Sequence, residues 1–239
     1  MCYDGTFAAE RMKVVRPALK ICGMTSKRDL DFCLRSGVDF AGFNFYRGSK
    51  RFIQPEEACR IWANRDPGST KAVGVVVNPG RSGLTSIVKG FPGLYGIQFH
   101  GAEPDDDLRW FHRAFPQLAI WRAAPVLSVS DINQALAKSR NVPVDLILFD
   151  SAGFGGAEGG VFGGSGQTFD WGVLQGVDIP IPFGIAGGIR PGLIAPLMEV
   201  SRKSGCSLLD IASGVEDSPG VKNHVAISQV IAGIDAGIF

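Results

Sequence analysis

The sequence predicts an α/β fold, and three observations support this class. Apolar runs of four to seven residues recur along the 239-residue chain, with amphipathic, helix-like segments between them. Most of these runs are apolar without strict alternation, which is typical of parallel strands buried on both faces. No charged or Pro/Ser-rich linker divides the chain, so we expect a single domain.

Eight of the apolar runs are predicted to be strands. They are Ala18–Cys22, Phe40–Phe45, Ala72–Val77, Leu94–Phe99, Leu118–Arg122, Val144–Asp150, Ile181–Ala186 and Leu208–Ala212. The intervals between them are long enough for a helix and two loops. Helices are predicted over Lys27–Ser36, Pro55–Ala63, Asp105–Phe115 and Ser130–Lys138. Eight such βα units predict a TIM (βα)8 barrel, with a doubly wound sheet as the alternative.

The ends and loops of the predicted barrel refine this picture. We expect residues 1–17 to be an N-terminal extension and residues 18–239 to form the barrel domain. Pro55 and Pro104 suit the first turns of their helices. Between Gly153 and Gly166, eight of fourteen residues are glycine, which predicts a long loop after the sixth strand.

Composition excludes several classes of function. Lys and Arg number 24 against 23 Asp and Glu, so the basic excess typical of a nucleic-acid or membrane-surface protein is missing. The five cysteines form no Cys-x-x-Cys pair and the three histidines are widely spaced, so we expect neither a disulfide framework nor a metal site. No signal peptide or apolar run of transmembrane length is found. We therefore expect a cytoplasmic protein that acts on a small molecule, as a monomer or homodimer.

Polar or small residues follow nearly every predicted strand. In chain order they are Cys22, Asn44 to Arg51, Asn78, His100, Arg122, Asp150, Gly187-Gly188 and Ser213-Gly214. In a TIM barrel the carboxyl ends of the strands surround the active site. We therefore expect these residues to face one cavity.

Cys22 and Asp150 are the candidate catalytic groups. Desolvation at the edge of an apolar barrel favours the protonated form of a carboxyl, which suits a general acid. A thiol across the same cavity is a candidate base, and an acid with a base can isomerise a substrate without a cofactor. An N-capping aspartate and an inert buried cysteine are the alternatives.

Two glycine turns and two basic side chains are candidates for substrate binding. Loops after strands seven and eight form the recurrent phosphate site of these barrels, so Gly187, Gly188, Ser213 and Gly214 predict a phosphorylated ligand. Two ordinary tight turns are the alternative. Arg51 can clamp a carboxylate or phosphate, and His100 can donate a hydrogen bond to a ligand. A solvated arginine and a structural histidine remain open as alternatives.

An ordered set of motifs resembles the phosphoribosylanthranilate isomerase family of tryptophan biosynthesis. The motifs are Lys20–Gly23, Gly42-Phe43 through Ser49–Arg51, Gly74 through Asn78, Gln98–Gly101, Phe149-Asp150, Gly163–Gly166 with Phe169–Trp171, Ala186–Gly188, and Asp210 through Glu216 with Gly220. The resemblance extends from about Leu19 to the C-terminus. It implies a (βα)8 barrel and a cofactor-independent Amadori rearrangement of a phosphorylated substrate.

The resemblance also implies roles for individual residues. Cys22 would be the general base, Asp150 the general acid, and Arg51 would meet the anthranilate carboxylate. Gly164 and Ser165 would join the residues that bind substrate. A thiolate base requires a lowered pKa, which a helix N-terminus or a cationic intermediate can supply.

Other interpretations remain open. An indole-glycerol-phosphate synthase would want lysine and glutamate pairs at strand ends. A histidine-pathway isomerase would want aspartates at strands one and five, where this chain has Cys22 and Arg122. A non-catalytic phosphosugar-binding barrel is an alternative from another functional class.

Overall fold

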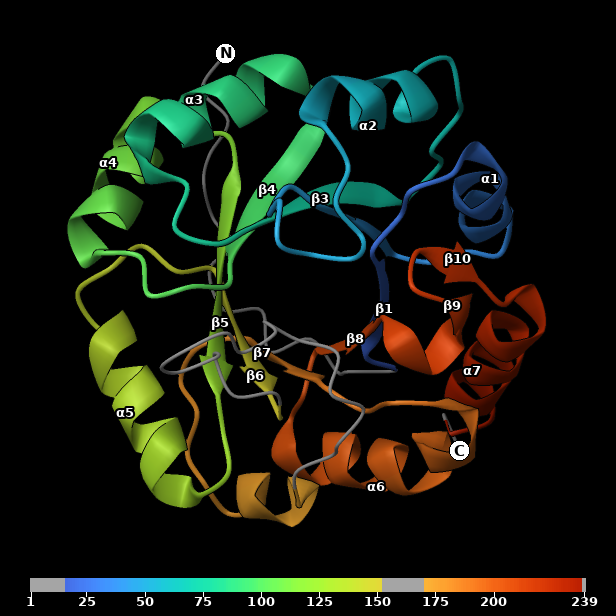
Figure 1. Cartoon of the computed structure of the whole chain (residues 1–239). Helices are drawn as coiled ribbons and strands as arrows, with labels where there is room; N and C mark the ends of the chain where they lie inside the picture. Colours follow the sequence, from blue (N-terminus) through green and yellow to red (C-terminus); the bar gives the residue numbers. More distant parts are fainter. Residues whose placement is uncertain (1–15, 152–169, 238–239) are drawn as a thin grey trace.

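Eight parallel strands close into a barrel in chain order, which confirms the predicted TIM (βα)8 fold (Figure 1). The computed structural model describes residues 16–151 and 170–237. The strands are β1 (Ala18–Cys22), β2 (Phe40–Asn44), β3 (Lys71–Val76), β4 (Leu94–Phe99), β5 (Ala119–Pro125), β6 (Leu146–Asp150), β7 (Phe183–Ala186) and β8 (Leu208–Ile211). Because β1 pairs with β8, the doubly wound alternative is wrong.

Helices surround the barrel on the outside (Figure 1). They are α1 (Lys27–Arg35), α2 (Pro55–Trp62), α3 (Gly80–Gly90), α4 (Asp105–Ala114), α5 (Val129–Ser139), α6 (Ile194–Ser204) and α7 (His224–Ala236). Short 3-10 helices are η1 (Trp171–Leu174), η2 (Pro191–Leu193) and η3 (Ser213–Val215), and a hairpin joins β9 (Glu216–Ser218) to β10 (Val221–Lys222). In the described part of the β6–β7 connection, η1 stands where a full helix was expected.

Two predicted segments lie wholly or largely outside the described residues, and of two predicted helix starts one is confirmed. Residues 1–15, which make up most of the predicted N-terminal extension, and the glycine-rich stretch 153–166 lie outside the described residues. Pro55 occupies the first turn of α2 as expected. Pro104 instead precedes α4 as its N-cap, so its predicted first-turn position is wrong by one residue.

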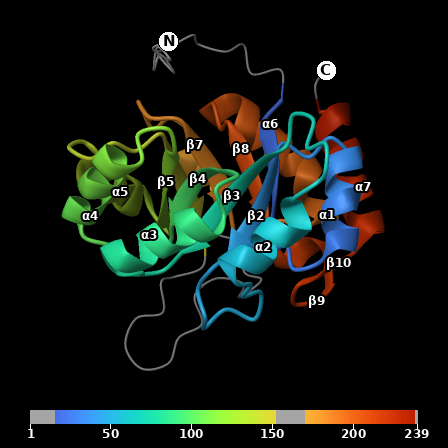
Figure 2. The ribbon, with the colours of Figure 1, turned by 90° about the horizontal axis from the view of Figure 1, so that it is seen from above.

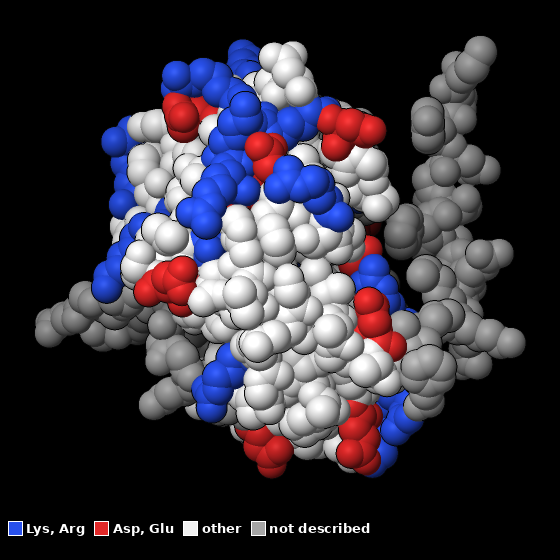
Figure 3. All heavy atoms as spheres, turned by 90° about the vertical axis from the view of Figure 1, so that its right-hand side faces the viewer, with Lys and Arg blue, Asp and Glu red and all other residues white. Residues whose placement is uncertain are grey.

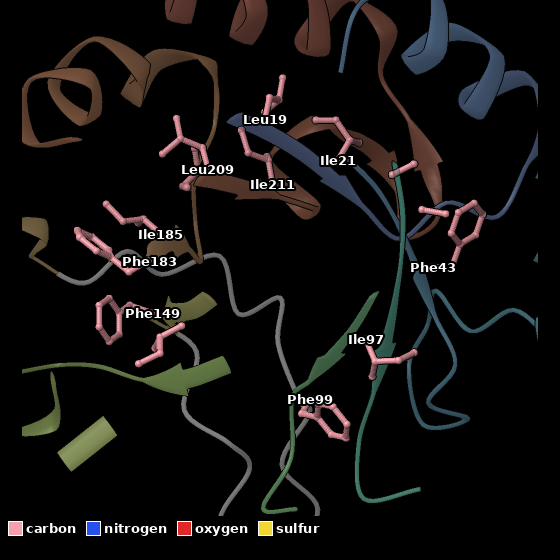
Figure 4. Packing of buried hydrophobic residues seen from close by; sticks show 14 of the residues in the cluster. Leu19, Ile21, Phe43, Ile97, Phe99, Phe149, Phe183, Ile185, Leu209 and Ile211 are labelled. Atoms are coloured by element: carbon pink, nitrogen blue, oxygen red, sulfur yellow. The ribbon is translucent and has the colours of Figure 1, made fainter. Parts of the chain in front are cut away.

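The core has two parts, one on each side of the barrel wall. Between the strands and the helices pack side chains such as Leu19, Ile21, Phe43 and Phe149, all at most 1% exposed (Figure 4). Inside the barrel a smaller apolar cluster includes Val73, Trp121, Ala123, Leu146, Leu148 and Leu208. Because both faces of each strand are buried, the strands appear in the sequence as continuous apolar runs.

The barrel interior also holds a buried ion pair. Lys20 of β1 and Asp210 of β8 occupy paired positions of these neighbouring strands, and their Nζ and Oδ2 atoms are 2.7 Å apart. The Lys20 side chain is fully buried. The pair therefore joins the first and last strands where the barrel closes.

The described surface includes a basic groove on the helical wall. Figure 3 shows the face that carries α1 and α7, where Lys and Arg gather over one part and uncharged residues cover another. Lys27, Asp31, Arg35, Arg60 and Arg65 are among the residues lining the groove. Its charge is partly neutralised, since Asp31 pairs with Arg65 and the nearby Glu57 with Arg60. No helix within residues 16–151 and 170–237 is long and apolar enough to cross a membrane.

We predict that truncating Phe43 destabilises the barrel strongly. Its fully buried ring packs edge-on against Phe91, with ring centroids 5.4 Å apart. Phe43→Ala should lower the free energy of unfolding by about 3–5 kcal/mol, measured by urea denaturation. Leu127→Ala is the control, because Leu127 is 73% exposed and should change stability by less than about 0.5 kcal/mol. Similar losses in the two variants would contradict this description of the core.

Candidate active site

One pocket lies at the carboxyl ends of the strands. It is lined by side chains and backbone from seven of the eight strands or the loops that follow them, including Cys22, Asn44, Arg51, Val75, Gln98, His100, Asp150, Ala186, Gly187, Gly188, Asp210, Ser213 and Gly214. In Figure 2 the segment between β2 and α2 and the β9–β10 hairpin lie at the same end of the barrel. Every described residue that the sequence singled out for catalysis or substrate binding contributes to this pocket.

Two of the residues that follow predicted strands, Asn78 and Arg122, do not line the pocket. Gly164 and Ser165 lie outside the described residues. Arg122 was expected at the end of strand five, but β5 continues to Pro125 and the Arg122 guanidinium turns outward to Asp105 Oδ1 at 2.6 Å. Asn78 accepts a hydrogen bond from the backbone of Ala102 and so helps to hold a loop.

Cys22 is the last residue of β1 and lies beside two charged groups. Its thiol makes a hydrogen bond with Lys20, two residues earlier on the same face of the strand. Burial raises the pKa of Cys22, and the positive charges of Lys20 and Lys222 partly oppose this effect. In the unliganded protein the pKa of Cys22 is therefore raised, and Lys20 is the cation that opposes this rise most.

Space for the Cys22 and Lys20 side chains is provided by a glycine on the neighbouring strand. A Cβ atom on Gly42 would lie 2.9 Å from Cys22 Sγ and 3.1 Å from Lys20 Cε. These distances are shorter than ordinary van der Waals contacts. Gly42 therefore lets the thiol and the ammonium group share the barrel interior at the base of the pocket.

Asp150 ends β6 and contacts His100, which follows β4. The His100 Nε2 and Asp150 Oδ2 atoms are 3.4 Å apart, and Gln98 Nε2 is 3.1 Å from His100 Nδ1. Burial lowers the pKa of His100 to about 4, so its imidazole is neutral at neutral pH. With the Gln98 amide donating to Nδ1, the imidazole proton resides on Nε2 and faces Asp150.

Arg51 at the edge of the pocket is held by Glu216. Its Nε and Nη2 atoms donate to the Glu216 carboxylate, with a shortest distance of 2.6 Å. Lys222 Nζ contacts the same carboxylate at 2.6 Å and also donates to the backbone carbonyl of Cys22. Although burial opposes ionisation, these two cations hold the pKa of Glu216 below its usual value. The β9–β10 hairpin thus orients Arg51 and the end of β1.

The two predicted glycine turns lie against each other. Gly187 and Gly188 have φ values of +87° and +64°, and a Cβ on Gly187 would lie 2.6 Å from Asp150 Oδ1. A Cβ on Gly214 would lie 1.8 Å from the carbonyl oxygen of Ile189. Only glycine fits such backbone conformations and contacts. The turns after β7 and β8 therefore form one compact backbone surface at the side of the pocket.

The arrangement combines the parts that acid–base chemistry on an anionic substrate requires. A thiol on β1 and a carboxyl on β6 line the same pocket. A backbone surface suited to phosphate lies beside the carboxyl, and a guanidinium lies at the edge. Among residues 16–151 and 170–237, no cluster of His, Cys, Asp and Glu could hold a metal ion.

Sequence reasoning missed four residues of this site as functional candidates. Lys20, Gln98, Asp210 and Glu216 were seen only as members of motifs. The signal for the first three was a charged or amide side chain inside a predicted strand that is otherwise apolar. A buried polar group of this kind needs a partner, and here the partners lie beside the predicted catalytic residues.

We predict that His100 makes stability depend on pH in a defined window. The pKa of His100 is 6.5 ordinarily and about 4 in the folded protein, so below pH 6.5 the unfolded chain binds a proton that the folded protein excludes. Stability from this group is present above that pH and is lost as the pH falls. Between about pH 7 and about pH 5 the loss should be about 2 kcal/mol.

Urea denaturation at several pH values measures this loss. His100→Asn should remove it, and His112→Asn should not, because His112 is exposed on α4. The carboxylates whose pKa is lowered are Asp29, Asp131, Glu199 and Glu216, and they lose their contributions as the pH falls below the ordinary pKa values of 3.8 for Asp and 4.5 for Glu. An unchanged pH dependence in His100→Asn would contradict the assignment.

We predict that Glu216 contributes far more to stability than an exposed carboxylate in a similar ion pair. Glu216→Gln leaves the buried Lys222 ammonium without its charge partner, so the free energy of unfolding should fall by about 3 kcal/mol or more. Glu199→Gln is the matched control, since Glu199 pairs with Lys203 at 2.7 Å on the exposed side of α6. That variant should lose far less stability, because an ion pair that is exposed to solvent contributes little. Thermal and urea denaturation measure both variants. If Glu216→Gln and Glu199→Gln lost the same stability, the role of Glu216 would be contradicted.

Comparisons with known proteins agree on one family. The sequence profile described as N-(5'phosphoribosyl)anthranilate (PRA) isomerase matches residues 19–232. The N-(5'-phosphoribosyl)anthranilate isomerase of Zymomonas mobilis subsp. pomaceae is 33% identical over 215 residues, which cover 90% of this chain and 96% of the relative.

Solved structures agree with the sequence comparison. The crystal structure of phosphoribosyl anthranilate isomerase from Thermotoga maritima superposes with a TM-score of 0.77 at 30% identity, covering 92% of this chain and 99% of the other. A phosphoribosyl anthranilate isomerase in complex with reduced 1-(o-carboxyphenylamino)-1-deoxyribulose 5-phosphate gives a TM-score of 0.74 at 29% identity, with the same coverage. The profile, the relative and the two structures together place this chain in the N-(5'-phosphoribosyl)anthranilate isomerase family.

Proposed function

We propose that the protein converts N-(5'-phosphoribosyl)anthranilate into 1-(2-carboxyphenylamino)-1-deoxyribulose 5-phosphate in tryptophan biosynthesis. The observation that carries this proposal is the presence of Cys22 and Asp150 in one pocket beside the paired glycine turns. An Amadori rearrangement of this substrate needs an acid at the furanose ring oxygen and a base at C2', and this pocket offers a candidate for each. The relatives named above support the same substrate.

Substrate binding uses the two anionic ends of the molecule. The phosphate lies against the turns of Gly187-Gly188 and Ser213-Gly214, whose backbone can approach closely because three of the four residues have no side chain. The anthranilate carboxylate meets Arg51, whose side chain Glu216 already holds at the edge of the pocket. Fixing both ends brings the ribose ring between Cys22 and Asp150.

Ring opening is the first chemical step. Asp150 donates a proton to the furanose ring oxygen, the C1'–O bond breaks, and the anthranilate nitrogen supplies electrons to form a protonated Schiff base at C1'. His100 contacts the Asp150 carboxyl and, being neutral, places no positive charge against it. The sugar is then an open chain with a free hydroxyl at C4'.

Proton transfer from C2' is the second step. The Cys22 thiolate removes this proton, and the C–H electrons form the C1'–C2' double bond while the Schiff base nitrogen is neutralised. The enolamine then tautomerises to the ketone at C2'. Burial raises the pKa of Cys22, so its thiolate needs a nearby positive charge. The cationic Schiff base supplies this charge in the pocket.

The proposal is tested by following the fluorescence of freshly prepared phosphoribosylanthranilate, whose N-linked anthranilate group is the fluorophore. Adding the protein should accelerate the loss of this fluorescence far above the spontaneous rate. A non-catalytic phosphosugar-binding barrel is the competing function. It predicts binding with no acceleration, and that result would overturn the proposal.

We predict that Cys22→Ala and Asp150→Asn each lower kcat by a factor of about 10² to 10⁴, because each removes one proton-transfer group. Substrate should still bind, since Arg51 and the glycine turns remain, and equilibrium fluorescence titration measures this. Cys59→Ala is the matched control, because Cys59 lies on α2 and does not line the pocket. Near-normal turnover in either pocket variant would refute the assigned role.

A further inference from the structure

Lys20 is a buried cation for which the proposed acid–base steps have no role. Its side chain is 0% exposed, and its Nζ atom lies 2.7 Å from Asp210 Oδ2. Its second side-chain partner is the thiol of Cys22. Burying an ammonium group inside an apolar barrel costs free energy unless the group is paired. The partners of Lys20 therefore indicate the role of this residue.

The placement of Lys20 follows from the geometry of β1. Residues two apart on a strand point to the same side, so Lys20 and Cys22 both face the barrel interior. Gly42 on the adjacent strand leaves room for both side chains, and a Cβ there would contact both of them. The ammonium group therefore contacts the Cys22 thiol from inside the barrel, and Lys20 itself does not line the pocket.

Four charged groups act on the Cys22 sulfur, and they differ in sign and reach. Lys20 on β1, Lys222 on β10 and Arg51 after β2 are positive, and Asp210 on β8 is negative. Lys222 reaches the backbone carbonyl of Cys22, and Arg51 donates to Glu216. Lys20 is the cation with a hydrogen bond to the thiol itself.

We propose that Lys20 is a positioning residue that holds the Cys22 sulfur at the base of the pocket and supplies the positive charge against which its thiolate forms. Asp210 weakens the effect of Lys20 on the thiolate, because its negative carboxylate pairs with the same ammonium group. The inference rests on the proposed function, in which Cys22 accepts the C2' proton. Lys20 keeps its own proton throughout, so the thiolate–ammonium pair becomes a thiol–ammonium pair when Cys22 is protonated by the substrate.

The two members of the ion pair should therefore affect the thiol in opposite directions. Removing the charge of Lys20 makes thiolate formation harder, and removing the charge of Asp210 makes it easier. A purely structural role predicts something different. Each variant would then disturb the same buried pair, and the thiol would respond in the same direction or not at all.

The test is the pH dependence of Cys22 alkylation by iodoacetamide in the unliganded full-length protein, with reaction at other cysteines subtracted using Cys22→Ser. Lys20→Met should move the midpoint to higher pH and slow alkylation at a fixed pH near neutrality by about tenfold or more. Asp210→Asn should move it to lower pH. Lys203→Met is the control, since Lys203 forms an exposed pair of the same 2.7 Å length.

A double variant keeps the test decisive if Lys20→Met fails to fold. Lys20→Met with Asp210→Asn leaves no unpaired buried charge, and its midpoint should lie above that of Asp210→Asn alone. Shifts in the same direction for the two single variants, or equal midpoints for Asp210→Asn and the double variant, would overturn the proposal.

Turnover distinguishes this inference from the proposed function. Lys20→Met should lower kcat at least tenfold with little change in KM, and raising the pH should recover part of the lost rate. If the wild-type protein fails to isomerise phosphoribosylanthranilate, the proposed function is refuted while the alkylation result stands. If the wild-type protein isomerises it but Lys20→Met leaves the midpoint unchanged, the role of Lys20 alone is refuted.

Discussion

The ion pair between Lys20 and Asp210 is the interaction on which the barrel and its pocket both depend. It joins β1 to β8, the two strands whose pairing closes the barrel, and it lies between an apolar interior and a polar pocket. A fully buried ammonium cannot be hydrated, so its partners must come from the protein. Those partners are Asp210 and the thiol of Cys22, which links closure of the barrel to the proposed base.

Strand geometry explains how the other site residues come together. Cys22 and Asp150 are the terminal residues of β1 and β6, and His100 directly follows β4, so all three lie at one end of the barrel. Glycines occupy the positions where a side chain would not fit. Gly42 lies beside the thiol of Cys22, and Gly187 lies beside the carboxyl of Asp150. The β9–β10 hairpin completes the edge, where Glu216 and Lys222 hold Arg51 and the end of β1.

The sequence predicts the order of the strands and the place of the site, because strands buried on both faces leave continuous apolar runs. Because these runs are apolar without strict alternation, they do not indicate which side chains face the barrel interior and which face the helices. Arg122 was therefore expected at the site, although it turns outward to Asp105, and Lys20 and Asp210 were not recognised as partners. Their pairing depends on the register between the first and last strands, which no local pattern records.

The division of labour between Cys22 and Asp150 is the central claim, and trapping the ring-opened intermediate tests it most directly. With enzyme in excess over phosphoribosylanthranilate, cyanoborohydride reduces the bound Schiff base, and the reduced product is quantified by mass spectrometry. Cys22→Ala retains the acid and lacks the base, so it should accumulate the trapped product faster than Asp150→Asn. Equal trapping in the two variants, or faster trapping in Asp150→Asn, would contradict the account.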